Sequence, residues 1–182
     1  AAKVKLTTFV SYTCPHCAQF ETEAEAPLRL SYVAPGKLSI EVRHVVRDPV
    51  DLTAAMLTNC GAKEKFFLNH AAFMRGQSRW IAPMGAASAA QQQRWRNPDI
   101  GQRNRAIASD FGFYAIMASR GYDRPSVDKC LTDKAMEARL MKQSQEAVAL
   151  GVRSTPGFAI NGTVPVGTNE WALLRPQLDA RF

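Results

Sequence analysis

Cys14 and Cys17 are separated by two residues, Pro15 and His16, and sulfurs at this spacing can alternate between a dithiol and a disulfide. The pair follows residues 3–10, whose β-branched and aromatic bias predicts a buried strand. Pro15 suits the first turn of a helix, because the N–H that it lacks has no partner there. A sulfur at a helix N-terminus meets unpaired N–H groups and the positive end of the helix dipole, which stabilise a thiolate. The motif therefore predicts a redox-active pair, with Cys14 as the exposed nucleophile and Cys17 as the more buried resolving cysteine.

The residues between the sulfurs favour the same chemistry. Pro15 fixes the turn, and His16 can donate a hydrogen bond or add positive charge near Cys14. Because a stabilised thiolate favours the dithiol, it makes the disulfide a stronger oxidant. The alternative is half of a zinc site, which needs about four protein ligands. No second C-x-x-C exists and the spacing of His44 and His70 does not suggest ligands, so we expect redox chemistry with no metal and no cofactor.

Two further cysteines, Cys60 and Cys130, lie in a stretch with helical character. They form either a structural disulfide or two buried free thiols that act as small apolar residues. The disulfide is favoured, because the two cysteines outside the C-x-x-C pair would bond to each other in an oxidising compartment. An even cysteine count is also compatible with an oxidising compartment.

Strand signals occur only near the two ends of the chain, with helical patterns between them. We expect strands at 3–10, 38–46, 157–161 and 163–166, and helices at 15–33 (bent at Pro27), 51–60, 63–74, 105–120, 126–131, 134–150 and 169–180. Residues 81–98 read as loop with at most one helical turn, and Asn161-Gly162 predicts a tight hairpin turn. The order is that of an α/β protein with a long helical segment in its middle.

This arrangement resembles the DsbA family of thioredoxin-fold thiol–disulfide oxidoreductases. The resemblance lies in residues 9–17 (FVSYTCPHC), in residues 151–158 (GVRSTPGF) and in the helical segment between them. It implies a thioredoxin fold with a large helical insertion. The thioredoxin-like domain is then discontinuous, formed by 1–48 and 151–182, and the insertion comprises 49–150.

The resemblance also implies that the Thr155–Pro156 peptide bond is cis and faces the two sulfurs. About 5–6% of X–Pro bonds in folded proteins are cis, so the residues alone would favour an ordinary trans proline in a turn. A cis bond here would turn the Thr155 backbone toward the sulfurs. There it could bind an extended substrate as an added strand does.

Two positions depart from the family pattern. The best-known members carry a buried acid six residues before the nucleophilic cysteine, where this sequence has Thr8. Water or Glu21, one helical turn beyond Cys17, is the candidate for proton transfer in its place, and the other interpretation of Glu21 is an ordinary solvated helix residue. Thr155 is the second departure, because strong oxidants of the family have an aliphatic residue there and isomerases frequently have threonine.

The function that the resemblance implies is the introduction of disulfides into exported proteins. Its expected partners are reduced or unfolded exported substrates and a membrane quinone-linked oxidase that recycles the enzyme, and its expected location is the periplasm. No signal segment is visible before the first predicted strand. The alternatives are a disulfide isomerase or reductase of the same fold, and a non-catalytic or zinc-binding module.

Composition excludes few classes. The 182 residues are 46% hydrophobic, enough for a normal core, and charges interrupt every long apolar run. The net charge of +7 comes largely from arginines between Arg75 and Arg105. These indicate a solvated basic face, because no nucleic-acid-binding motif accompanies them.

Overall fold

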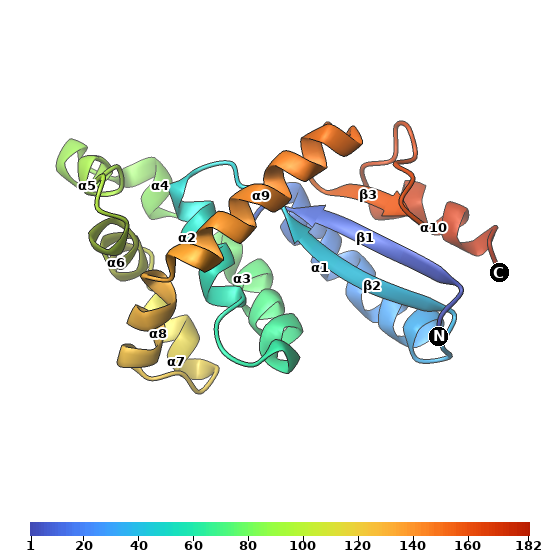
Figure 1. Ribbon diagram of the computed structural model, residues 1–182, viewed down its shortest axis with the longest axis horizontal. Helices are drawn as coiled ribbons and strands as arrows, with labels where there is room; N and C mark the ends of the chain where they lie inside the picture. Colours follow the sequence, from blue (N-terminus) through green and yellow to red (C-terminus); the bar gives the residue numbers. More distant parts are fainter. The chain divides into compact units, whose positions relative to one another are not determined.

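The computed structural model describes residues 1–182, which divide into two compact units. The first, here called the sheet unit, comprises residues 1–45 and 142–182. The second, the helical unit, comprises residues 46–141. Figure 1 shows the strands of the first and the helices of the second. The mixed α/β composition agrees with the predicted fold class.

A three-stranded sheet forms the centre of the sheet unit, in the order β2-β1-β3. The middle strand β1 (Val4–Val10) runs parallel to β2 (Leu38–His44) and antiparallel to β3 (Gly157–Ile160). All of β1 except Lys5 is buried, as expected for a strand with neighbours on both edges and covered faces.

Side chains alternate along β1, so its two faces contribute to two apolar clusters. One cluster contains Leu6 and lies under α1 (Pro15–Pro27), the π-helical turn η1 (Leu28–Val33) and α10 (Trp171–Asp179). The other contains Phe9, with side chains from the end of α9 (Lys134–Leu150) and from β3. The sheet is therefore packed on both faces, and both clusters are completed by residues from the C-terminal part of the chain.

The helical unit is built around α2 (Pro49–Thr58), in which residues 50–58 are all buried. Its other elements are η2 (Lys63–Lys65), α3 (Phe66–Trp80), α4 (Pro83–Ala86), α5 (Ala89–Arg94), α6 (Ile100–Asp110), α7 (Phe113–Ser119), α8 (Arg124–Leu131) and the first half of α9. A disulfide joins Cys60, just after α2, to Cys130 in α8. None of the helices has both the length and the apolar character needed to cross a membrane.

The units divide within α9, whereas the expected boundary lay at residue 150. The helical unit ends at Met141, and residues 142–150 belong to the sheet unit. The physical reason is packing: Ala147 lies in the apolar cluster of Phe9, and Gln143 is hydrogen-bonded to the end of β2. One uninterrupted helix, whose N-terminus is capped by the Asp133 carboxylate, thus contributes to both units.

Three predicted elements are wrong in detail. The strand expected at 163–166 is absent, because Ile160 forms only one bridge with Thr163 and Pro165 has no N–H to continue the pairing. The helix expected at 105–120 is two helices, α6 and α7, separated by Gly112 in the left-handed region at φ 71°.

The segment 81–98, expected to be loop with at most one helical turn, contains α4 and α5. Pro83 begins α4, and a capping box between Ser88 and Gln91 begins α5. Neither helix has a buried residue, so the apolar periodicity that marks packed helices is missing from this sequence.

The Cys60–Cys130 disulfide is expected to stabilise the fold by about 2–4 kcal/mol, because it restricts a 70-residue loop in the unfolded chain. The test uses a Cys14→Ser/Cys17→Ser background, in which no other disulfide can form. Adding Cys60→Ala and Cys130→Ala to that background should lower the free energy of unfolding in urea by this amount. Unfolded background protein should contain no titratable thiol, and two free thiols would contradict the pairing.

Candidate active site

Cys14 occupies the N-cap position of α1, directly after the turn that follows β1. Its backbone is extended, at φ −92° and ψ 117°, and Pro15 is the first helical residue. The backbone N–H of Cys14 donates to the Ser11 carbonyl at 3.3 Å, and the N–H of Cys17 donates to the Cys14 carbonyl at 3.1 Å. No side-chain hydrogen bond caps this helix, so its first N–H groups can stabilise a negative charge on the Cys14 sulfur.

The loop before β3 brings Thr155 to the same sulfur. The Thr155–Pro156 peptide bond is cis, as the family resemblance implies. The Cys14 sulfur lies 3.4 Å from the Thr155 carbonyl oxygen, to which it donates when protonated, across 141 residues of sequence. Pro156 is buried and Thr155 is half-buried, so the loop covers the sulfur while the threonine stays partly accessible.

The pKa of the Cys14 thiol is lowered from its ordinary value of 9.0 to about 5. The largest cause is a hydrogen bond with the Cys17 side chain, and burial opposes it. Hydrogen bonds from the Thr155 side chain and from the backbone N–H groups of Cys17 and His16 lower the pKa further. At neutral pH Cys14 is therefore a thiolate, which is the nucleophilic form of cysteine.

The pKa of Cys17 is shifted in the opposite direction, well above its ordinary value. Burial is the largest cause, followed by the hydrogen bond and the electrostatic repulsion from Cys14. The two sulfurs, neither of them disulfide-bonded in this structure, thus share one proton, which resides on Cys17. This asymmetry provides one nucleophile and one neutral hydrogen-bond donor within a single helical turn.

The structure modifies the expected roles of several site residues. Cys14 was expected to be exposed, but only 4% of its surface is accessible, against 1% for Cys17, because the Thr155 loop lies against its sulfur. The His16 side chain is exposed, and the residue lowers the Cys14 pKa through its backbone N–H. Glu21 is 9% exposed, so its interpretation as a solvated helix residue is wrong. Thr8 is buried on the same face of β1 as the Leu6 side chain that packs toward α1.

Gly157 is a site residue that the sequence interpretation missed. A Cβ atom there would lie 2.9 Å from the Ser154 carbonyl oxygen and 2.6 Å from a Val152 methyl group. Only glycine therefore allows the loop to close on itself directly after the cis bond, where Gly157 pairs with Phe9 of β1. The available signal was its position, immediately after the proline of the loop.

No group of three or more histidine, cysteine, aspartate or glutamate side chains is arranged to hold a metal ion. The chemistry that the geometry offers is that of the two sulfurs. A low-pKa thiolate, a protonated partner one turn away and a strand-like loop beside them define a thiol–disulfide exchange site of the thioredoxin type.

Comparisons with known proteins agree with this class. The family model described as "Thioredoxin" matches residues 1–180. The chain therefore belongs to the thioredoxin family, and its fold is the DsbA-like form with a helical insertion. A crystal structure described as a protein-disulfide isomerase from Novosphingobium aromaticivorans is 50% identical, with a TM-score of 0.95 over 100% of this chain and 93% of the other.

More distant similarities show the fold alone or extend over part of a longer protein. The structure of α-DsbA1 from Wolbachia pipientis is 22% identical, with a TM-score of 0.73 over 98% of this chain and 85% of the other. A Rickettsia bellii protein provisionally named a protein-disulfide oxidoreductase is 25% identical over 88% of this chain and 54% of its own length. The chain thus spans about half the length of the curated relatives that it matches.

The Cys14 thiolate is expected to titrate with a midpoint at about pH 5. Ultraviolet absorbance of the thiolate, followed against pH in the reduced protein, measures this midpoint. Thr155→Val removes one hydrogen bond to the thiolate and should raise the midpoint, whereas Thr155→Ser retains the hydroxyl group and should leave it nearly unchanged. Equal midpoints for the valine and serine variants would show that the hydroxyl group does not contribute.

Stability should depend on pH in a way specific to the dithiol form. The folded-state pKa of Cys14 is depressed, so its contribution to stability is fully present above the unfolded-state pKa of about 9 and is lost as the pH falls through about 5. The free energy of unfolding of the dithiol form should therefore rise, relative to that of the disulfide form, between these pH values. Urea unfolding of both forms across this range measures the difference, and a constant difference would contradict the lowered pKa.

Proposed function

We propose that this protein is a thiol–disulfide oxidoreductase that introduces disulfides into exported proteins through Cys14 and Cys17. The observation that carries the proposal is the opposite displacement of the two thiol pKa values, with that of Cys14 lowered to about 5. A stabilised thiolate favours the dithiol over the disulfide, and this makes the disulfide an oxidant.

The exchange proceeds in two displacements. A substrate thiolate attacks the Cys14 sulfur of the Cys14–Cys17 disulfide, and the Cys17 sulfur leaves and takes up a proton. A second substrate thiolate then attacks the substrate sulfur of the mixed disulfide, and Cys14 leaves as a thiolate. Two electrons pass from the substrate to the cysteine pair. The low pKa of Cys14 favours the second step, because a weakly basic thiolate is the better leaving group.

Thr155 and Pro156 are proposed to hold the substrate during this exchange. Thr155 is half-buried, and its carbonyl oxygen lies 3.4 Å from the Cys14 sulfur. An extended peptide that pairs with the Thr155 backbone, as in strand addition, would have its cysteine beside Cys14.

Glu21 is proposed to take part in proton transfer to and from Cys17. It lies four residues after Cys17 in α1, on the same side of the helix, and it is buried. The pKa of Cys17 is raised by burial, so its proton needs an acceptor inside the protein when this sulfur reacts.

The partners and location follow from the same proposal. Reduced or unfolded exported proteins are the substrates, the periplasm is the compartment, and a membrane quinone-linked oxidase restores the Cys14–Cys17 disulfide. The Cys60–Cys130 disulfide supports an oxidising compartment, because such bonds persist mainly there.

A disulfide isomerase is the second candidate function. Two observations favour it: the threonine at position 155, and the description of the 50% identical crystal structure as a protein-disulfide isomerase. The two candidates differ in the reduction potential of the cysteine pair and in their substrates. An oxidase acts on reduced proteins, and an isomerase acts on proteins with wrongly paired disulfides.

Equilibration with glutathione distinguishes these functions. An oxidase is expected to show a reduction potential of about −120 mV and to oxidise reduced, unfolded ribonuclease. A potential of about −180 mV together with reactivation of scrambled ribonuclease would favour the isomerase, and about −270 mV would indicate a reductase.

Two variants serve as controls for this measurement. Cys14→Ser removes the nucleophile and should abolish the exchange. Cys17→Ser retains the Cys14 thiolate, so glutathione disulfide should convert it to a Cys14–glutathione mixed disulfide that mass spectrometry detects. Failure of this adduct to form would contradict the role of Cys14 as the attacking sulfur.

A further inference from the structure

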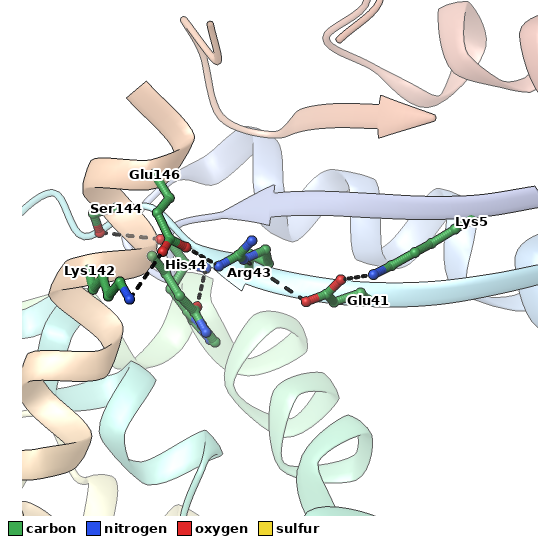
Figure 2. A network of polar contacts seen from close by, with 8 residues as sticks. Lys5, Glu41, Arg43, His44, Lys142, Ser144 and Glu146 are labelled. Carbon is green, nitrogen blue, oxygen red and sulfur yellow. Dashed lines mark hydrogen bonds and ion pairs between the residues drawn. The ribbon is translucent and has the colours of Figure 1, made fainter. Parts of the chain in front are cut away.

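His44, the last residue of β2, is a buried histidine to which the proposed exchange reaction assigns no role. Only 2% of its surface is exposed. Its ring lies between Tyr12, with 5.7 Å between ring centroids, and Gln143 of α9, whose Oε1 is 3.0 Å from Nδ1. Figure 2 shows His44 and Arg43 at the end of β2, facing Ser144 and Glu146 of α9.

The contacts of His44 define which ring nitrogen carries the proton. Gln143 Oε1 accepts a hydrogen bond from the His44 backbone N–H at 3.0 Å, so the atom facing His44 is the amide oxygen. The same oxygen lies 3.0 Å from Nδ1 and can only accept, so Nδ1 carries the hydrogen. In the neutral ring Nε2 is then an acceptor, and Tyr12 Oη, 3.4 Å away, is the donor. With the ring neutral, the hydrogen bonds therefore run in one direction, from Tyr12 through His44 to Gln143.

The Tyr12 end of these hydrogen bonds lies close in sequence to the reacting sulfur. Tyr12 is fully buried and lies two residues before Cys14, in the turn where the Cys14 N–H donates to the Ser11 carbonyl. A backbone hydrogen bond also joins the ends of β2 and β1, because the Val45 N–H donates to the Val10 carbonyl at 2.9 Å. His44 is thus in contact with the turn that precedes Cys14.

The Gln143 end of these hydrogen bonds lies in α9, which is followed by the Thr155 loop. The Ser144 hydroxyl donates to the His44 carbonyl at 3.2 Å, and the Glu146 carboxylate pairs with Arg43, so this part of α9 is held against β2. The Val152 N–H donates to the Ala147 carbonyl just after α9 ends. The chain then reaches Thr155 within three residues.

We propose that His44 is a positioning residue that holds the Cys14 turn and the Thr155 loop at the spacing that the exchange reaction requires. The inference rests on the proposed redox function, because it assigns His44 a task in that site. A positioning role for His44 differs from a packing role in one measurable respect. A histidine that only fills the core changes stability when it is replaced, whereas a positioning histidine also changes the properties of the Cys14 sulfur.

Two conservative variants test the inference. Tyr12→Phe removes only the hydroxyl group that donates to Nε2. His44→Asn places an amide N–H where Nδ1 was, which preserves the bond to Gln143 and loses the bond to Tyr12. Each should raise the Cys14 pKa by up to about one unit and weaken oxidation of glutathione by about threefold to tenfold. The double variant should change both quantities no more than either single variant, since both remove the same bond.

Tyr32→Phe is the matched control. It removes a tyrosine hydroxyl of the same unit that donates to Asp179 at 2.5 Å, away from the sulfurs. It should lower the melting temperature without changing the Cys14 pKa or the glutathione equilibrium. The inference is overturned if Tyr12→Phe and His44→Asn behave like this control, with a lower melting temperature and an unchanged Cys14 pKa.

Failure of the proposed function gives a separate result. The Cys14 pKa is measured on the reduced protein and does not require oxidase activity. If the parent protein fails to oxidise ribonuclease but its Cys14 pKa rises in both variants, the positioning role stands and the oxidase proposal falls. His44→Gln offers a rescue, because its longer side chain returns an amide to the Nε2 position and should restore the parent pKa in part.

Discussion

A single negative charge on the Cys14 sulfur is the constraint on which the site depends. The charge is stabilised by the Cys17 thiol, the Thr155 side chain and the N–H groups at the start of α1, and together these outweigh the cost of burial. Cys17 and these N–H groups are local, but Thr155 lies 141 residues away in the sequence, so the sheet must bring it to the sulfur. The cysteines follow β1, and Thr155 lies just before β3, which pairs beside β1. The packing of the sheet unit therefore adds the Thr155 hydrogen bond to the local groups that lower the Cys14 pKa.

Two identical side chains acquire opposite properties because of where they lie. Cys14 lies at the start of α1, where the backbone N–H groups of His16 and Cys17 stabilise its charge, and Cys17 lies one turn further in, where burial favours the neutral thiol. The Cys17 thiol is the largest cause of the lowered Cys14 pKa, and Cys14 adds to the effect of burial in raising the Cys17 pKa. With threonine at position 8, the face of β1 that carries Leu6 has no ionisable group. Buried Glu21 is the carboxylate nearest in sequence to Cys17.

The sequence predicted those parts of the site that depend on local signals. A strand followed by C-x-x-C with proline at the first helical position was sufficient to locate Cys14 at a helix N-terminus. The helix expected at 134–150 is α9, which begins and ends at these residues. Local signals did not reveal that Cys14 is buried, because the Thr155 loop that covers it comes from 141 residues away. The Tyr12–His44–Gln143 hydrogen bonds were missed for the same reason, since they join separate segments. The requirement for Gly157 was missed although it is local, because it depends on how the loop folds back against Val152 and Ser154.

The discontinuous sheet imposes an order on folding. β1 leaves the ribosome long before its partner β3, with which it pairs Leu6 to Ile160. Until then one edge of the central strand is unpaired, and such edges favour association with other chains. All four cysteines are synthesised before β3, and four cysteines allow three pairings. Until the fold is complete, Cys14 and Cys17 can therefore form the wrong disulfides with Cys60 and Cys130. Early closure of the Cys60–Cys130 bond within the helical unit would leave only Cys14 and Cys17 to pair with each other.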